Sequence, residues 1–284
     1  MAFSSHSQYD SKTIDSMRKS YKSALSDFRA SGSAFQIFCS VPDLGNVKAP
    51  VNTLYVLDSS FNPPTKAHMH LARSALMTDS RRTPLRLLLL LAIKNADKAP
   101  KPAAFEDRLV MMTLMAEEIC REMREMREEE VVVDVGVTGE PFYYKKAEVI
   151  EQSGAYDRLK EGEQVHITGF DTIIRVFDPK YYPDGMSVLQ SMFDKGKLRV
   201  HLRDGDEREQ RGYLESIRKG EREGQGVKRE WAQRIEMVEP MREFVSSTEA
   251  RRCVVEHEGE GLGMFVGESV REYILKEKLY EEGV

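Results

Sequence analysis

The sequence predicts one large α/β domain of the Rossmann-like, doubly wound kind, with helices on both faces of a mostly parallel sheet of five or six strands. Short apolar runs alternate with longer stretches of helical periodicity, which is typical of stacked β-α-β units. The chain has 284 residues, enough for one large domain and a tight fit for two. Apolar residues make up 40% of it, so it can bury a substantial core.

Residues 1–50 are interpreted as a helical opening arm, and the main domain covers residues 51–284. Within the arm, residues 11–29 are predicted to be helical because apolar side chains recur on one helical face, which would pack on the main body. The residues of that face are Ile14, Met17, Tyr21, Leu25 and Phe28.

Six short apolar runs are candidate strands. The prediction is five strands, or six if the last run is counted. In chain order they cover residues 54–58, 85–91, 131–135, 165–168, 198–202 and 234–238. Helices are predicted between and after these runs from the 3.6-residue period of their apolar positions. They cover residues 66–77 and 104–124, with one that starts near Ser247 and one within 266–280.

Charged residues of both signs alternate in two stretches, 121–130 and 203–230. The first is interpreted as the solvated end of a helix. The second is rich in glycine and is interpreted as a mobile insertion with some helix, which could offer a surface to a protein partner. Because acids and bases alternate there, a nucleic-acid patch is the weaker interpretation.

Overall charge and hydropathy favour neither a nucleic-acid partner nor a membrane. The net charge is -5 and the pI is about 5.8. The longest apolar run, 85–93, falls far short of the roughly 18 residues of a membrane span. No targeting signal is visible at the start, so a cytoplasmic and/or nuclear location is expected. The three cysteines are far apart, which favours neither a disulfide framework nor a thiolate metal site.

The most informative segment joins the first predicted strand to the first predicted helix, at Ser59-Ser60-Phe61-Asn62-Pro63-Pro64-Thr65-Lys66-Ala67-His68. Ligands bind at such junctions in open α/β sheets. Small residues at Ser59 and Ser60 let backbone N–H groups approach a phosphate, and Thr65 is placed to cap the helix. His68 then lies exposed in the first helical turn, where the positive end of the helix dipole attracts phosphate oxygens. A plain proline-rich loop before a capped surface helix is the competing interpretation.

A second candidate segment lies near the end of the chain, at residues 245–251. Ser246 followed three residues later by Glu249 is a capping-box pattern, which predicts a helix N-terminus with clustered hydroxyl and amide groups. Arg251 lies in the first turns of that helix, and its planar guanidinium suits phosphate oxygens. A capped helix with a surface arginine is the alternative.

These two segments resemble the two signature motifs of the nucleotidylyltransferase superfamily, in the form found in eukaryotic nicotinamide mononucleotide adenylyltransferases. The first is similar to Gly-Ser-Phe-Asn-Pro-x-Thr-x-x-His, with Thr65 and His68 on the family's signature positions. The second, Val-Ser-Ser-Thr-Glu-Ala-Arg at 245–251, is similar to Ile-Ser-Ser-Thr-x-x-Arg. The resemblance covers about residues 53–280, and the opening arm resembles those of a fungal branch of the family.

The resemblance implies roles for the matching residues. His68, Thr65 and Arg251 would be catalytic. The implied ATP and phosphate ligands are Ser59, Ser60, Phe61, Lys94, Lys98, Gly169, Asp171, Ser246, Ser247 and Thr248. Gly169 and Asp171 match an element that contacts adenosine, although a strand end followed by a helix cap would look the same. Lys94 and Lys98 lie on a loop after the second predicted strand, and which of them would contact phosphate stays open.

Some positions depart from the family's pattern. Ser59 replaces the first glycine of the phosphate loop and Ala67 replaces another, but both are small. Eukaryotic relatives carry Thr-Trp-Glu after the third strand, where the Trp stacks on nicotinamide, whereas this chain reads Val-Gly-Val-Thr-Gly-Glu-Pro-Phe-Tyr at 135–143. The one tryptophan is Trp231, at the edge of the charged stretch. Phe142 or Tyr143 is the predicted stacking surface for the acceptor, and packing against the next helix is an equally good interpretation.

The predicted function is transfer of AMP from ATP to nicotinamide mononucleotide in NAD synthesis, by direct attack on the α-phosphate with release of pyrophosphate. Mg²⁺ would bridge the ATP phosphates as a mostly hydrated ion, without a dedicated protein site. Two alternatives stay open: another transferase of the superfamily, of the cytidylyltransferase or pantetheine-phosphate adenylyltransferase type, or a nucleotide-binding regulatory protein with weak ATPase activity. Nicotinamide versus nicotinate acceptor and the oligomeric state are also open.

Overall fold

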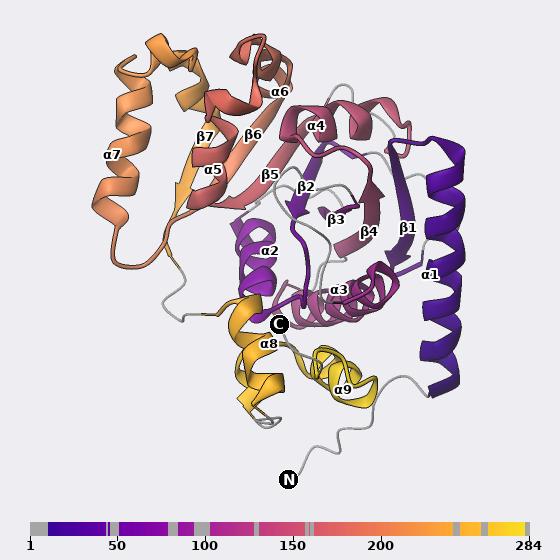
Figure 1. Ribbon diagram of the computed structural model, residues 1–284. Coiled ribbons are helices and arrows are strands. Elements are labelled where there is room, and N and C mark those ends of the chain that lie inside the picture. The colour runs from indigo at the N-terminus through magenta and orange to yellow at the C-terminus, as the bar shows by residue number, and fades with distance from the viewer. Residues whose placement is uncertain are drawn as a thin grey trace.

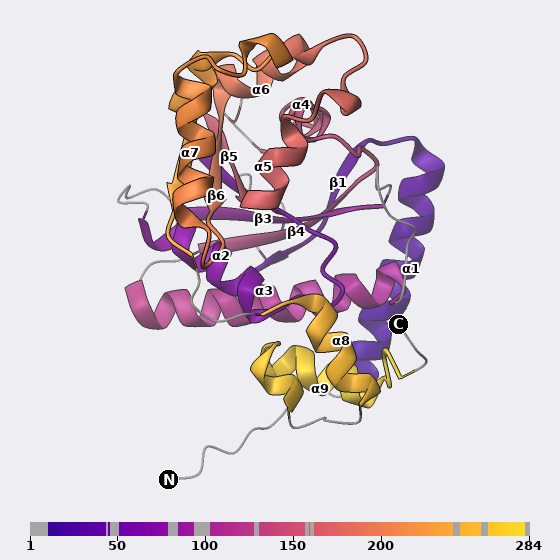
Figure 2. The same ribbon diagram turned by 60° about the vertical axis from the view of Figure 1, so that its left-hand side comes forward.

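In the computed structural model a seven-stranded sheet lies between two layers of helices (Figures 1 and 2). The structure describes residues 11–43, 45, 51–78, 85–93, 103–127, 131–156, 159, 162–240, 245–256 and 261–281. The strands are β1 (Phe35–Val41), β2 (Thr53–Asp58), β3 (Leu85–Ala92), β4 (Val131–Thr138), β5 (Glu163–Gly169), β6 (Gly196–His201) and β7 (Ile235–Val238). The α-helices are α1 (Ser11–Ser31), α2 (Lys66–Thr78), α3 (Phe105–Arg127), α4 (Tyr143–Gln152), α5 (Phe170–Val176), α6 (Gln190–Lys195), α7 (Glu207–Arg218), α8 (Ser247–Val255) and α9 (Glu268–Lys276).

The strand order across the sheet is β1-β4-β3-β2-β5-β6-β7. Every neighbouring pair is parallel except β1 with β4. From β2 the chain builds outward through β3 and β4, then returns to β5 on the other side of β2 and builds outward again. The direction of winding therefore reverses between β2 and β5, which is where doubly wound sheets bind ligands. The Rossmann-like prediction is confirmed, with β7 present as the sixth predicted strand.

The count of five or six strands is too low because β1 was not predicted. It lies in the opening arm and pairs with β4, with Phe35 opposite Thr138 and Val41 opposite Val133. Its sequence, Phe-Gln-Ile-Phe-Cys-Ser-Val, has β propensity, but its partner strand lies about a hundred residues further on, and no local pattern reveals that pairing. The predicted helix before it is confirmed as α1.

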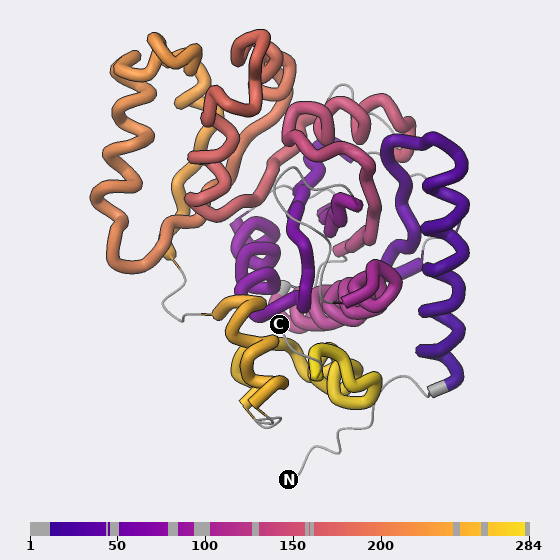
Figure 3. Tube along the Cα trace, viewed as in Figure 1, coloured from indigo at the N-terminus to yellow at the C-terminus, as the bar shows by residue number. Residues whose placement is uncertain are grey.

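Alternation along the central strands divides the core between the two faces. In β2, Tyr55 and Leu57 point toward the face covered by α1, α2, α3, α8 and α9, while Leu54 and Val56 point toward the face that carries α4. Figure 3 shows α8 and α9, the last helices of the chain, close to α2 and α3 near its C-terminus. The end of the chain is thereby brought to the loop that follows β2.

The charged stretch 203–230 contains α7 and a short 3₁₀ turn. Leu214, Ile217 and Val227 are buried, whereas most of the alternating charges along α7 are exposed. Beside them Trp231 stacks on Phe193 with ring centroids 5.1 Å apart, in the core that covers β6 and β7. The indole is thus used in packing.

A buried ion pair joins β3 to β4. Arg86 donates from Nε to Asp134 Oδ2 at 2.7 Å and from Nη2 to Oδ1 at 2.9 Å. Tyr156 and Ser40 donate to the same carboxylate at 3.0 and 2.6 Å, and the Asp134 side chain is fully buried. Such a carboxylate is costly to bury unless its oxygens are fully hydrogen-bonded, as they are here.

Candidate functional site

The candidate site lies at the carboxyl end of β2, in the loop that leads into α2. Phe61 is fully buried and adopts a positive φ of 44°, a conformation that side chains other than glycine rarely take. Phe61 was predicted among the phosphate ligands, but its ring packs in the core against His68, with centroids 5.1 Å apart. Its side chain therefore helps to fix the loop and the imidazole, and its contact with phosphate stays a prediction.

The two predicted segments meet at this loop. Ser247 Oγ donates to the carbonyl of Pro63 at 2.8 Å, and Arg251 Nη1 donates to the carbonyl of Asn62 at 2.8 Å. Near the chain's end, Tyr280 also donates its hydroxyl to Asn62 Oδ1 at 2.9 Å. Because three hydrogen bonds from distant residues hold it, the loop is preorganised.

His68 is held at both ring nitrogens. The backbone N–H of Thr65 donates to Nδ1 at 2.9 Å, and the Thr65 hydroxyl lies 2.8 Å from the same atom. Because Nδ1 accepts from a backbone N–H, the proton of the neutral ring lies on Nε2, which is 2.9 Å from Ser59 Oγ. The ring is half-buried, not exposed as its first-turn position predicted, and burial lowers its pKa to about 4. At neutral pH it is therefore an uncharged Nε2–H donor.

The second segment begins α8 as its pattern predicted. Ser246 is the N-cap, and its Oγ accepts the N–H of Glu249 at 3.1 Å. Arg251 makes further hydrogen bonds to the Ser247 carbonyl and to exposed Thr248, while its Nε is buried without a hydrogen-bond partner among the described residues. The guanidinium is thus anchored beside the loop with one donor left over.

Gly169 and Asp171 lie where β5 passes into α5, next to β2. Gly169 is the N-cap residue of α5, and Asp171 is exposed in the first turn, where it pairs with Arg203 beyond β6. A groove of about 470 Å³ runs from here between α5 and α7, lined by Phe170, Tyr213 and other residues. Lys94 and Lys98, the predicted loop lysines, lie outside the described residues.

The predicted acceptor residues differ in their surroundings. Phe142 is the N-cap residue of α4 and stacks on Tyr144, with ring centroids 6.1 Å apart. Tyr143 instead packs edge-on against buried His166 at 5.9 Å, and the ammonium of Lys146 lies 5.2 Å from its ring centroid. Phe142 also lies near Tyr181, with ring centroids 6.3 Å apart, and both Phe142 and Tyr143 are partly buried.

A buried ion pair next to this loop was not predicted from the sequence. Lys146, on α4, donates to Asp58, the last residue of β2, and both side chains are less than a tenth exposed. In the sequence, the only sign of this pair is an acid, Asp58, directly before Ser59. The pair ties α4 to the start of the loop.

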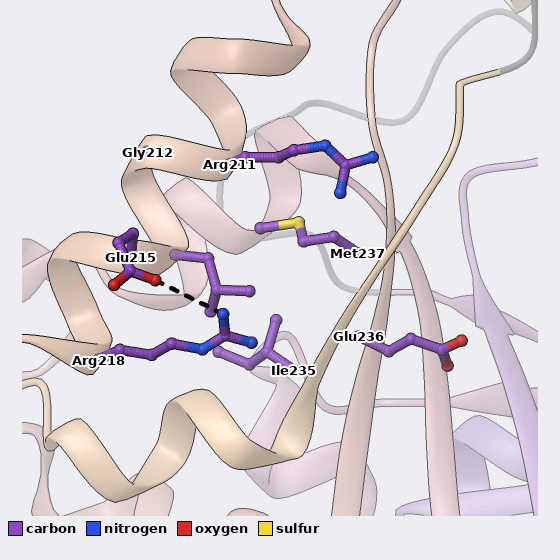
Figure 4. Close-up of a pocket in the computed structure, with 8 residues that line it drawn as sticks. Arg211, Gly212, Glu215, Arg218, Ile235, Glu236 and Met237 are labelled. Atoms are coloured by element: carbon purple, nitrogen blue, oxygen red, sulfur yellow. Dashed lines mark ion pairs between the residues drawn. The ribbon is translucent and has the colours of Figure 1, made fainter.

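A separate groove of about 620 Å³ lies between α7 and the edge strand β7. Figure 4 shows residues that line it. Arg211, Glu215 and Arg218 project from α7 across it, and Glu215 pairs with Arg218 at 3.5 Å. Ile235 and Met237 line the strand side.

Buried histidines predict a pH-dependent stability. Burial lowers the pKa of His166 and of His201 to about 3, with smaller contributions from Lys146 and Arg199 respectively, and that of His68 to about 4. An unfolded histidine titrates near 6.5, so below that pH the unfolded chain binds more protons than the folded one. We expect the free energy of unfolding to fall between pH 7 and 5.

Urea unfolding at several pH values measures this dependence. The slope should be smaller in His166→Gln, which removes one of the titrating groups, whatever that variant does to stability at pH 7. A free energy of unfolding that stays constant from pH 7 to 5 would contradict the prediction.

A doubly wound sheet whose switch point carries a preorganised loop, an imidazole donor and an arginine near a helix N-terminus is typical of a nucleotide-binding protein of the Rossmann-like class. The chain is 31% identical over 250 residues to a fission yeast (Schizosaccharomyces pombe) protein named "Putative nicotinamide mononucleotide adenylyltransferase". The match covers 85% of this chain and 89% of the relative. The chain belongs to the nicotinamide mononucleotide adenylyltransferase family.

Solved structures with a similar course of the chain include Plasmodium falciparum nicotinic acid mononucleotide adenylyltransferase complexed with NaAD. It is 14% identical, with 82% of this chain and 98% of that chain covered and a TM-score of 0.49. The same Plasmodium enzyme complexed with APC gives 13% identity, the same coverage and a TM-score of 0.48. No family model matches the chain. Within the described residues no helix is long and apolar enough to cross a membrane.

Proposed function

We propose that this chain transfers the AMP part of ATP onto nicotinamide mononucleotide, forming NAD and pyrophosphate. The observation that carries the proposal is the convergence of Ser247 and Arg251 on the carbonyls of Pro63 and Asn62, 184 and 189 residues away in the chain. Both segments suit phosphate, and they adjoin the Nε2–H donor of His68 at the switch point of the sheet. Family membership supports the same reaction.

The reaction needs little proton chemistry from the protein. An oxygen of the acceptor's 5′-phosphate attacks the α-phosphorus of ATP, and as that bond forms, the bond to the bridging oxygen breaks and its electron pair leaves with pyrophosphate. The attacking oxygen is already anionic, so no general base is required. The protein's contribution is to align the two phosphates and to stabilise the charge that develops during transfer.

In this proposal His68 donates from Nε2 to an α- or β-phosphate oxygen in place of its contact with Ser59. Thr65 is a positioning residue, because its N–H fixes the tautomer of His68. Arg251, with Ser246, Ser247 and Thr248, would hold the departing pyrophosphate. The backbone around Ser59 and Ser60 would approach the phosphates, while Gly169 and Asp171 would meet the adenosine.

We expect Mg²⁺ to accompany ATP. The carboxylate closest in sequence to the phosphate loop, Asp58, is occupied by Lys146, so the ion would be held through the nucleotide's own phosphate oxygens and water. When bound, it would neutralise part of the polyphosphate charge. A cytoplasmic or nuclear location, the division into an arm and a main domain, and a partner at 203–230 stay predictions.

An acceptor panel tests the proposal. Purified protein with Mg²⁺ and ATP should form a dinucleotide and pyrophosphate with nicotinamide or nicotinate mononucleotide, and the ratio of the two kcat/KM values would fix the preferred ring. Pantetheine phosphate, and CTP with a phospho-alcohol, should give no product above a control without enzyme. Product with either of these alone, or slow ATP hydrolysis without transfer, would overturn the proposal in favour of the two alternatives.

We predict that Phe142 supplies the stacking surface for the acceptor ring. Phe142→Ala should raise the KM of the mononucleotide about fivefold, the equivalent of about 1 kcal/mol of aromatic contact, and leave the KM of ATP nearly unchanged. Steady-state kinetics with each substrate varied in turn measures both values. Tyr143→Phe, which keeps the ring beside His166, is the control and should change neither. Equal effects of Phe142→Ala on both substrates would refute the assignment.

A further inference from the structure

Arg108, which no motif singled out, lies at the end of the first turn of α3 and is only 5% exposed. Its Nε donates to the carbonyl of Ala103 at 3.0 Å, and its guanidinium lies 5.0 Å from the ring centroid of Phe105. Neither contact supplies negative charge. Among the described residues no carboxylate pairs with Arg108, although buried arginines are usually paired.

The carboxylate next to it in the chain is occupied elsewhere. Asp107 accepts from Arg18 Nε at 2.7 Å and from the hydroxyl of Tyr273 at 2.8 Å, which ties α1 and α9 to α3. The buried arginines of the sheet have acids: Arg86 pairs with Asp134, and Arg199 with Glu236. Within the part of the chain that the structure describes, Arg108 differs from them as a buried cation without an acid.

Its surroundings increase the positive potential. Burial lowers the pKa of Arg108, Tyr280 raises it by a smaller amount, and repulsion from nearby Arg251 lowers it. The start of a long helix such as α3 also carries positive partial charge, which disfavours a cation and favours an anion. Tyr280, whose hydroxyl bonds Asn62, lies close enough to both guanidinium groups for them to lower its pKa against the larger rise caused by burial.

Arg251 thus bonds the Asn62 carbonyl of the loop, and Arg108 lies near both Arg251 and Tyr280. Among the described residues no acid pairs with Arg108, and Arg251 Nε is buried without a partner. A polyphosphate would balance both charges and accept from the two guanidinium groups. We propose that Arg108, Arg251 and the N-terminus of α3 form the subsite for the β- and γ-phosphates of ATP, which leave as pyrophosphate. This inference rests on the proposed function and adds Arg108 to its site.

Binding of inorganic pyrophosphate with Mg²⁺ to the full chain, measured by calorimetry without acceptor, tests the subsite. Arg108→Met should weaken binding of pyrophosphate at least tenfold. Arg108→Lys, which keeps the charge but loses the paired donors of the guanidinium, should weaken it less. Arg73→Met is the control: it removes an arginine of α2 that already pairs with a carboxylate, Glu122, and it should leave the affinity unchanged. In the forward reaction the inhibition constant of pyrophosphate should rise in Arg108→Met, with the KM of the mononucleotide unchanged.

Equal pyrophosphate affinity in wild type and folded Arg108→Met would overturn the inference. If Arg108→Met does not fold, hydrogen exchange on the wild-type chain decides: pyrophosphate should slow exchange of the amides at residues 105–108, and no protection there would overturn it. The two proposals fail separately. Pyrophosphate binding that depends on Arg108 without dinucleotide formation would remove only the proposed acceptor, and normal synthesis with Arg108-independent binding would remove only the subsite.

Discussion

His68→Ala is expected to lower kcat by a hundredfold or more while leaving ground-state binding of ATP much less affected. The Nε2–H donor acts on charge that grows at the phosphates during transfer, and loss of one such preorganised donor typically costs about 3 kcal/mol of transition-state stabilisation. Stability should fall modestly, because the variant loses the hydrogen bond that Thr65 donates to Nδ1. Single-turnover rates and ATP titrations measure the two effects separately.

Two further variants test whether the loss of kcat is specific to the Nε2–H donor of His68. In His68→Asn the amide oxygen can still accept from Thr65, but no donor reaches the position of Nε2, so its kcat should fall nearly as far as that of His68→Ala. His70→Ala is the matched control, because His70 points about 200° around α2 from His68 and lies edge-on to His201 at 6.0 Å. A His68→Ala enzyme with near wild-type kcat would exclude His68 from the chemistry.

Asp134→Ala is expected to destabilise the fold by about 3–5 kcal/mol, the cost of leaving a buried charge unpaired. The substitution orphans Arg86, which is itself buried, and removes the acceptor of Tyr156 and Ser40. Chemical denaturation followed by circular dichroism measures the free energy of unfolding. Because the network lies between β3 and β4, away from His68, any folded fraction should keep its KM values.

The exposed pair of Glu223 with Arg229 is the control for this prediction. Glu223→Ala should leave the free energy of unfolding unchanged within error, because solvent screens surface ion pairs. An Asp134→Ala variant as stable as wild type would mean that the buried network contributes nothing to the fold.

Most of the fold could be predicted because most of its strands are marked by a local run of apolar residues. Apart from Arg86, the run 85–91 is apolar on both faces, as is typical of a central parallel strand, and the structure extends it only to Ala92. β1 was not predicted because its position is set by pairing with β4, which is a long-range contact. The predicted end of the third strand at residue 135 was also early, since the pairing with β3 and β1 continues to Thr138.

The parts of the site that could be predicted are those marked by a short local motif. Ser246 caps α8 as its capping-box spacing required, and His68 opens α2. What could not be predicted are the contacts that only folding creates, such as Lys146 with Asp58 or Arg108 beside Arg251. These residues have no motif around them, and only the packing of α3 and α4 on the sheet shows that their charges are buried.

Transfer of an α-phosphate label tests the central claim most directly. With ATP labelled at the α-phosphorus and nicotinamide mononucleotide in a single turnover, all of the label consumed should enter NAD, with one unlabelled pyrophosphate released for each dinucleotide. Chirally thio-substituted ATP should show inversion at the α-phosphorus, as one direct displacement requires. Label recovered as free AMP or ADP, or retention of configuration, would contradict direct adenylyl transfer.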